Sequence, residues 1–281
     1  MVKNFIKIII FGSTFLFIFL SFSQLSRAET SSPIKILLVP GHDNEIWGSQ
    51  YGNLKEATMN LAVATRIYNL LKKDIRFEVY ITRDKNGYTK EFADYFNNNQ
   101  ADILAFVQNK KQQMQNNIAS GQFIQKVNPP HLTASPDVAL RLYGFNKLAD
   151  ENKMDAVIHI HFNDYPRPNA WTLGKYRGFV IYVPDGQLSN WKESGQLAAD
   201  IFTQLHKKYI TSTYPPELGG LVPDQKLIAL GANDTLNASV RSILIEYGYI
   251  YRFGNNATRS NNYTDMANRT VAGIKNYFFP Q

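Results

Sequence analysis

Short apolar runs alternate with amphipathic segments along most of the chain. The runs are rich in β-branched residues and apolar at successive positions, which is typical of strands buried on both faces of a parallel sheet. The pattern predicts strands at residues 34–39, 77–82, 156–161, 178–183 and 241–246. Helical spacing of apolar residues predicts helices over 54–73, 136–152, 191–209 and 265–278. The alternation indicates an α/β fold with a mainly parallel, doubly wound sheet and helices on both faces.

Two helix starts carry additional signals. Ser135 is a good N-cap residue, and Pro136 suits the first helical position, where its missing N–H costs nothing. Asn190 and Glu193 have the spacing of a capping box. We therefore expect helices to begin directly after residues 135 and 190.

Residues 85–134 do not fit the alternation. Two amphipathic segments, 89–98 and 102–118, predict helices, and the second carries an apolar stripe made of Ile103, Phe106, Val107 and Met114. We expect a helical insertion between the second strand and the helix at 136–152. It either adds packing at the edge of the sheet or forms a lid over the site, because long insertions in compact domains are often functional.

The first 28 residues have the pattern of a secretory signal peptide. Lys3 and Lys7 form a basic start, residues 8–20 are mostly apolar, and Ser26-Arg27-Ala28 offers small residues at a cleavage site. An uncleaved membrane anchor is the alternative, but a span needs about 20 apolar residues. We expect residues 29–281 to form an exported domain, periplasmic, cell-wall associated or extracellular, without a stable membrane span.

Charge and composition narrow the classes of function. Removal of Lys3, Lys7 and Arg27 with the leader lowers the formal net charge from +7 to +4. This mild charge favours approach to an anionic polymer such as a cell wall, but without a basic cluster it does not indicate nucleic-acid binding. The chain has no cysteine, which excludes disulfides, thiolate zinc sites and cysteine nucleophiles. Any metal must be held by His, Asp or Glu.

Polar residues with metal-binding chemistry follow three of the predicted strands. His42 comes after Pro40-Gly41, His161 ends the run at 156–161, and Glu246 ends the run at 241–246, while Glu56 begins a helical pattern. Ligand sites of open α/β sheets form at the carboxyl ends of the strands. Two imidazoles and a carboxylate, with a second carboxylate in reserve, match a hydrolytic zinc site with a fourth position for water.

Each of these residues also has a purely structural interpretation. His42 can simply belong to a glycine turn, and Glu56 can favour a helix N-terminus through the macrodipole. Glu246 can be a buried carboxylate paired with Arg241 or Arg83. A charged group at the end of an apolar strand is costly to bury, however, which favours a catalytic role.

Several short motifs occur in the same order as in the zinc-dependent N-acetylmuramoyl-L-alanine amidases, the type-3 cell-wall amidases, and the chain resembles this family. The motifs are Pro40-Gly41-His42, Gly52-Asn53-Leu54-Lys55-Glu56, Asn60-Leu61-Ala62, Thr82-Arg83-Asp84, Ile160-His161-Phe162-Asn163, Gly178-Phe179-Val180-Ile181-Tyr182 and Leu244-Ile245-Glu246-Tyr247-Gly248-Tyr249. They cover roughly residues 33–84 and 136–279. Each motif alone is weak, but their common order and compatible spacing make the resemblance fairly specific.

The resemblance implies roles for individual residues. His42, Glu56 and His161 would be the ligands of a Zn2+ ion, and Glu246 would be the catalytic carboxylate. Asn163 completes the motif around His161 and is a candidate for substrate binding.

Four further residues lie near the expected site. Trp47 and Tyr51, in a loop flanking it, can stack on sugar rings or simply pack in the loop, as can Trp171. His159 projects to the same side of its strand as His161, about 7 Å away. We expect His159 to support a ligand from behind or to belong to the core.

The chain also departs from the family pattern. Val39 stands where the family usually has an acidic residue, and Asp43 and Asn44 replace glycines that usually follow the histidine. A carboxylate commonly orients a ligating histidine, so the loss at position 39 predicts weaker metal binding unless Asp43 substitutes.

The expected function is hydrolysis, at zinc, of the amide between N-acetylmuramic acid and L-alanine in peptidoglycan. The substrate comes from the resemblance, and the residues themselves support only zinc hydrolysis. Two alternatives are open: a non-catalytic peptidoglycan-binding or regulatory protein on the same fold, and a zinc peptidase or deacylase that acts on another amide. Peptidoglycan is the expected partner, and an activator protein remains unidentified.

Overall fold

The computed structural model of the protein describes residues 32–131 and 133–280, and Pro33–Gln281 form one compact unit. The expected signal peptide and its cleavage site lie outside the described residues. None of the helices in the described ranges combines the length and apolar character needed to cross a bilayer.

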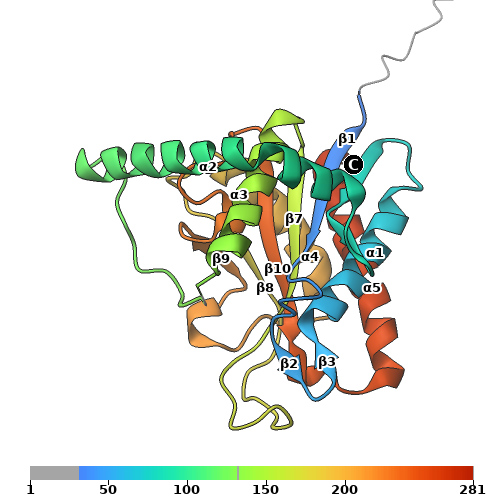
Figure 1. Cartoon of the computed structure of the whole chain (residues 1–281). Coiled ribbons are helices and arrows are strands. Elements are labelled where there is room, and N and C mark those ends of the chain that lie inside the picture. Colours follow the sequence, from blue (N-terminus) through green and yellow to red (C-terminus); the bar gives the residue numbers. More distant parts are fainter. Residues whose placement is uncertain (1–31, 132, 281) are drawn as a thin grey trace, which may run out of the picture. The chain divides into compact units, whose positions relative to one another are not determined.

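A six-stranded sheet forms the centre of this unit (Figure 1). Its strands, in the order β4-β1-β7-β10-β8-β9, are β4 (Phe77–Ile81), β1 (Ile34–Pro40), β7 (Ala156–Asn163), β10 (Arg241–Tyr249), β8 (Val180–Pro184) and β9 (Leu221–Asp224). All neighbours are parallel except β10 and β8, which are antiparallel. The five predicted strands and the mainly parallel sheet are confirmed. Strand β9 was not predicted, because it is short and contains Pro223, which cannot donate to a ladder.

Helices cover both faces of the sheet, as expected. They are α1 (Glu56–Leu71), α2 (Lys90–Ala119), α3 (Pro136–Glu151), α4 (Trp191–His206) and α5 (Asn256–Phe278). The largest apolar core packs α1, α4 and α5 on one face, and a second core packs α2 and α3 on the other. The short elements are β2 (Gln50–Tyr51), β3 (Leu54–Lys55), β5 (Arg83–Asp84), β6 (Gly87–Tyr88), η1 (Pro215–Glu217), η2 (Ile228–Leu230) and η3 (Ile250–Arg252).

The structure confirms two predicted helix starts, at residues 136 and 191, and corrects one. The Ser135 side chain accepts a hydrogen bond from the backbone N of Val138, as an N-cap should. Asn190 makes no cap hydrogen bond with its side chain, so no capping box forms there; Glu193 instead accepts from the Tyr277 hydroxyl. Helix α5 begins at residue 256 rather than 265, because the Asn255 side chain caps it.

The predicted helical insertion is a single helix with a kink. Both predicted segments belong to α2, and Asn99 between them has non-helical backbone angles of φ −120° and ψ 16°. Ile103 and Val107 are buried against Tyr143 of α3, as the apolar stripe required. Figure 1 shows α2 lying across α3.

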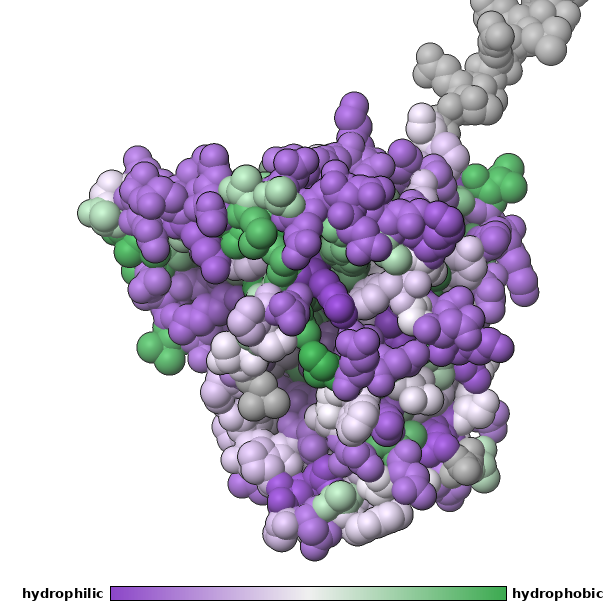
Figure 2. Space-filling view, in the orientation of Figure 1, coloured by the Kyte–Doolittle hydropathy of each residue, from purple (hydrophilic) through white to green (hydrophobic). Residues whose placement is uncertain are grey.

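The chain after α2, residues 122–131, runs back along the edge of the sheet. It is held by the ion pairs Lys126–Asp185 and His131–Asp224 at the ends of β8 and β9. Within the described residues no hydrogen bond or ion pair joins the insertion to His42, Glu56 or His161, so a lid remains a prediction. The surface in this view is mostly hydrophilic, with small separate apolar patches (Figure 2).

Candidate metal centre

A strained turn at the end of β1 presents His42. Gly41 packs so closely on His161 that a Cβ on it would lie 2.1 Å from the His161 Cε1 atom. The next residue, His42, has φ 60°, in the left-handed region that side chains other than glycine seldom adopt. Backbone strain of this kind persists where the surroundings hold it in place, often at functional sites.

Two buried side chains provide that support. Arg83 is 1% exposed and donates hydrogen bonds to the carbonyl oxygens of Pro40 (3.2 Å), Gly41 (3.0 Å) and Ala57 (2.8 Å). Asn60 donates to the Gly41 carbonyl at 2.9 Å. The turn that carries His42 is therefore fixed to the first residues of α1.

Glu56 is the first residue of α1 and is 3% exposed. The backbone N–H of Ser49 donates to Oε2 at 3.0 Å, and Asn60 and the backbone N–H of Phe162 donate to Oε1 at 3.3 and 3.4 Å. These donors fix the orientation of the carboxylate. It points at the two histidines rather than capping its own helix, which argues against a purely helix-stabilising role.

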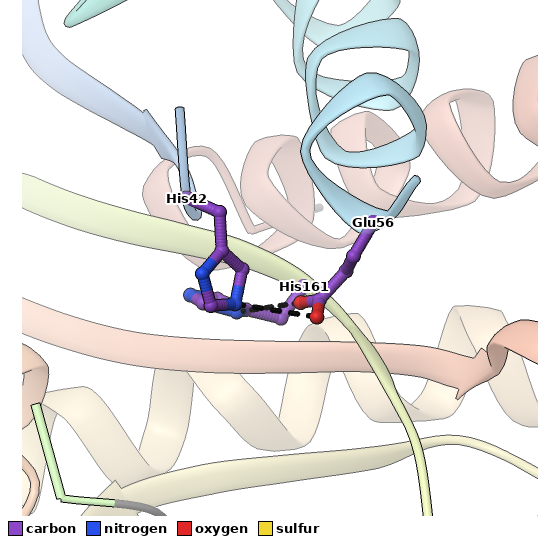
Figure 3. A group of neighbouring side chains, drawn as sticks. All are labelled: His42, Glu56 and His161. Atoms are coloured by element: carbon purple, nitrogen blue, oxygen red, sulfur yellow. Dashed lines mark hydrogen bonds and ion pairs between the residues drawn. The ribbon is translucent and has the colours of Figure 1, made fainter. Parts of the chain in front are cut away.

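The three predicted ligands meet at one point (Figure 3). His42 Nε2 lies 3.2 Å from Glu56 Oε2, and His161 Nδ1 lies 3.1 Å from Glu56 Oε1. One ligand atom from each residue lies within 4.8 Å of the other two. A tetrahedral zinc with bonds of about 2.0–2.1 Å separates neighbouring donors by about 3.3 Å. The donor types thus fit a zinc ion, and the separations of 3.2 and 3.1 Å are close to this value.

Gly48 completes the wall of this centre. Its φ is +72°, and a Cβ there would lie 2.5 Å from His42 Cδ2 and 2.6 Å from Glu56 Oε2. The loop backbone therefore touches both ligands, and only glycine meets the demands of space and conformation together.

Electrostatics tie the three groups together. Burial would raise the pKa of Glu56, but hydrogen bonds with His161 and His42 outweigh it and hold that pKa well below its usual range. Burial lowers the pKa of His161 despite Glu56. Burial also acts to lower the pKa of His42, but the hydrogen bond with Glu56 and the charge of Glu56 have the larger effect and raise the pKa of His42. The Glu56 carboxylate is ionised, as a metal ligand must be.

Glu246 lies beside the three converging residues. Glu246 of β10 lies directly opposite His161 of β7, and the two side chains point to the same face of the sheet. Burial, reinforced by the charges of Glu56 and Glu217, raises its pKa well above the usual value. Neither arginine considered as a partner reaches it: Arg83 binds backbone carbonyls, and Arg241 lies near Asp155 and Glu193.

The remaining predicted residues take different positions. His159 is 1% exposed, its Nε2 has no hydrogen-bond partner in the described chain, and burial lowers its pKa to about 3. Trp47 is 39% exposed and lies under the Lys55 ammonium group. Tyr51 packs against the exposed Trp171, with ring centroids 6.3 Å apart. Asn163 donates to Glu217 and accepts from the backbone of Asp164.

Asp43 does not replace the acid missing at position 39. Its Oδ1 accepts from the backbone N–H groups of Glu45 and Ile46, and its Oδ2 pairs with Arg141 of α3 at 3.0 Å. Asp43 therefore shapes the loop after His42 rather than orienting an imidazole.

Sequence reasoning missed Glu217. It is a buried carboxylate in η1, 2% exposed, and its charge reaches Glu246. It follows Pro215-Pro216 and belongs to no apolar run, so no pattern marked it.

A sequence comparison points to one family of enzymes. The sequence model described as N-acetylmuramoyl-L-alanine amidase, Amidase_3, matches residues 36–108. This match supports the amidase family that the motifs predicted. The matched segment contains His42 and Glu56 and ends before His161 and Glu246. The expected family and its enzyme class are confirmed, and no curated protein matches the chain.

Solved structures share the fold. An N-acetylmuramoyl-L-alanine amidase from Clostridium difficile 630 is 16% identical with a TM-score of 0.55, covering 89% of this chain and 100% of its own. The amidase Ami1 from Mycobacterium smegmatis has the same identity and TM-score, covering 89% and 99%. The CwlD amidase from Clostridioides difficile, in complex with the GerS lipoprotein, is 16% identical with a TM-score of 0.54, covering 87% and 98%. These similarities confirm the α/β fold.

Proposed function

We propose that this chain is a zinc-dependent hydrolase that cuts the amide between N-acetylmuramic acid and L-alanine in peptidoglycan. The observation that carries the proposal is the convergence of His42, Glu56 and His161, with Glu246 beside them. The family match supplies the substrate class.

In this proposal the three converging residues hold Zn2+. The bound ion supplies Lewis-acid polarisation of the scissile carbonyl and activates water as a nucleophile. Glu56 contributes the negative charge and is fixed in advance by Ser49, Asn60 and Phe162, so ion binding requires little rearrangement.

Glu246 acts as the general base. Its carboxylate takes the proton from the attacking water and returns it to the nitrogen of the leaving L-alanine. The raised pKa suits this exchange, because a base works best when its pKa lies near the working pH. Trp47 and Trp171 are exposed, and in this proposal their rings stack on sugar rings of the substrate.

We further propose that the protein is exported, with residues 1–28 as a cleaved leader. N-terminal sequencing of the exported protein should then begin at Glu29. We also propose a partner protein for this chain, by analogy with the CwlD amidase, which was solved in complex with the GerS lipoprotein.

The test is digestion of purified sacculi by the mature protein, with added zinc and with chelator, followed by mass spectrometry. We expect free lactyl carboxyl groups paired with new L-alanine amines, in the zinc sample only. Chelator-insensitive binding without cleavage would indicate the wall-binding alternative, and cleavage elsewhere would indicate a peptidase or deacylase. Glu246→Gln should retain zinc and lose activity by about 100-fold or more; full activity in that variant would remove Glu246 from the mechanism.

A further inference from the structure

Four neutral hydrogen-bond donors converge on the buried carboxylate of Glu217. Asn163 Nδ2 and the Tyr182 hydroxyl both donate to Oε1, each at 2.8 Å. The Tyr249 hydroxyl donates to Oε2 at 2.9 Å, and the Ser212 hydroxyl donates to the same oxygen. Every lone-pair direction of this carboxylate is thus occupied by the chain itself, so Glu217 has no capacity left for substrate.

The two donors on Oε1 are diagonal neighbours of Glu246. In the antiparallel pair β8/β10, Tyr182 lies opposite Leu244, two residues before Glu246. In the parallel pair β7/β10, Glu246 lies opposite His161, two residues before Asn163. Residues two positions apart share a face, and diagonal neighbours lie within reach of long side chains. Both donors therefore stand where they could bind Glu246.

Glu246 nevertheless receives no such bond. Its Oε2 is buried and has no hydrogen-bond partner among the described residues. A buried carboxylate oxygen ordinarily finds a donor, and an exception calls for an explanation. Both diagonal donors, Tyr182 and Asn163, donate to Glu217 instead.

We propose that Glu217 is a positioning residue: it binds Tyr182 and Asn163 and thereby keeps the Glu246 carboxylate free of internal donors. This inference rests on the proposed function, in which Glu246 takes a proton from water. A carboxylate that already accepts two strong hydrogen bonds is a weaker base, because those bonds stabilise its charged form. Asn163 is then part of this support rather than a substrate-binding residue.

The test uses the zinc-loaded mature enzyme and a soluble muropeptide substrate. In Glu217→Gln the side-chain size is kept, but the negative charge is lost and the remaining amide oxygen is a weaker acceptor, so the Tyr182 hydroxyl should turn to the charged carboxylate of Glu246. We expect kcat to fall by at least about tenfold. KM should stay within about twofold, with unchanged zinc content, because substrate binding and the metal ligands are not altered.

Rescue distinguishes positioning from a structural role. In the double variant Glu217→Gln/Tyr182→Phe, the released hydroxyl is absent, and we expect kcat to recover by about fivefold or more over Glu217→Gln. If Glu217 were only a structural anchor, the second substitution would restore nothing. A double variant no faster than the single one would overturn the proposal.

Two controls separate the effect from lost stability. Tyr249→Phe removes one donor from the opposite oxygen of Glu217 and should lower stability without the drop in kcat. Asp265 lies in the remote helix α5 and also accepts a hydrogen bond from a tyrosine, the Tyr209 hydroxyl at 2.8 Å. Asp265→Asn removes this carboxylate. If Glu217→Gln, Tyr249→Phe and Asp265→Asn all lose kcat in proportion to their loss of stability, the proposal is contradicted.

A structural measurement decides the point independently of activity. Crystal structures of the wild-type and Glu217→Gln proteins should show the Tyr182 hydroxyl on Glu217 in the first and on Glu246 in the second. A Tyr182–Glu246 hydrogen bond in the wild type, or a Tyr182 that stays in place in the variant, would overturn the proposal. If the wild type does not cleave muropeptides, the proposed function fails, while these structures still test the role of Glu217. They also serve if the variant is too unstable for kinetics, because the wild-type result alone can contradict the claim.

Discussion

Arg83 offers a direct test of how the metal centre is held in place. Its guanidinium is buried and binds the three carbonyl oxygens of Pro40, Gly41 and Ala57 without a carboxylate partner in the described residues. Substitution by Met keeps much of the volume and removes all three donors. The turn that carries His42, at φ 60°, then loses its main support.

The expected loss of stability follows from these contacts. A hydrogen bond to a charged group contributes about 1.5–3 kcal/mol, so three such bonds are a large gross term. Removing the guanidinium also recovers its desolvation cost of several kcal/mol. We expect a net loss of about 2–4 kcal/mol in the free energy of unfolding, and a fall in Tm of about 5–15 °C for a domain of this size.

Zinc affinity should fall together with stability. A misplaced His42 changes the geometry of the ligand set, and loss of a group that supports a ligand typically costs about 10–100-fold in metal affinity. The assays are urea unfolding of the metal-free protein and competition of zinc against a chromogenic chelator. Arg177→Met, at an exposed side chain, is the matched control and should stay within about 0.5 kcal/mol of the wild type. An Arg83→Met protein with wild-type stability and zinc affinity would refute the reasoning.

Two further predictions address Gly48 beside the metal centre and the segment 122–131 at the edge of the sheet. Gly48 and Gly121 have nearly equal φ values of +72° and +76°, but a Cβ at position 48 would touch His42 and Glu56, whereas one at position 121 meets nothing within 4 Å. Both Ala variants should lose about 1–2 kcal/mol of stability through left-handed backbone strain, and Gly48→Ala should lose more because its Cβ collides with His42 and Glu56. Only Gly48→Ala should bind zinc more weakly by calorimetry; equal affinities would contradict the described wall. Asp185 has a lowered pKa, because hydrogen bonds from Lys126 and Gln187 outweigh the opposing effect of burial. Its contribution is therefore present above the unfolded pKa of about 3.9 and is lost as pH falls through the folded value. The difference in unfolding free energy between wild type and Asp185→Asn should be constant from pH 8 to 5 and shrink below about pH 4, and a difference that grows in acid would be inconsistent with this sign.

The sequence predicted the fold well wherever local pattern and packing agree. The five predicted strands are buried on both faces, so their continuous apolar runs were visible, and Ser135 marked its helix by local chemistry alone. Strand β9 and the early start of α5 escaped, since Pro223 obscures a strand and a polar first turn carries no periodicity. At these positions tertiary contacts or a single cap decide the structure.

The candidate site divides in the same way. His42, His161 and Glu246 follow apolar strands, where topology brings them to one edge of the sheet, and Glu56 was marked by its place at the start of a helical pattern. Arg83 was visible only as part of a motif, and its role depends on three carbonyls that no linear pattern brings together. Glu217 lies in an irregular segment whose position is set by the hydroxyls of Ser212, Tyr182 and Tyr249, so it was found only in the structure.

The central claim is that His42, Glu56 and His161 hold a single zinc ion. Anomalous diffraction at the zinc edge from crystals of the zinc-loaded protein tests it directly. The account predicts one strong peak, about 2.0–2.2 Å from His42 Nε2, His161 Nδ1 and a Glu56 oxygen. A peak bound elsewhere, or none near these three residues at saturating zinc, would contradict it.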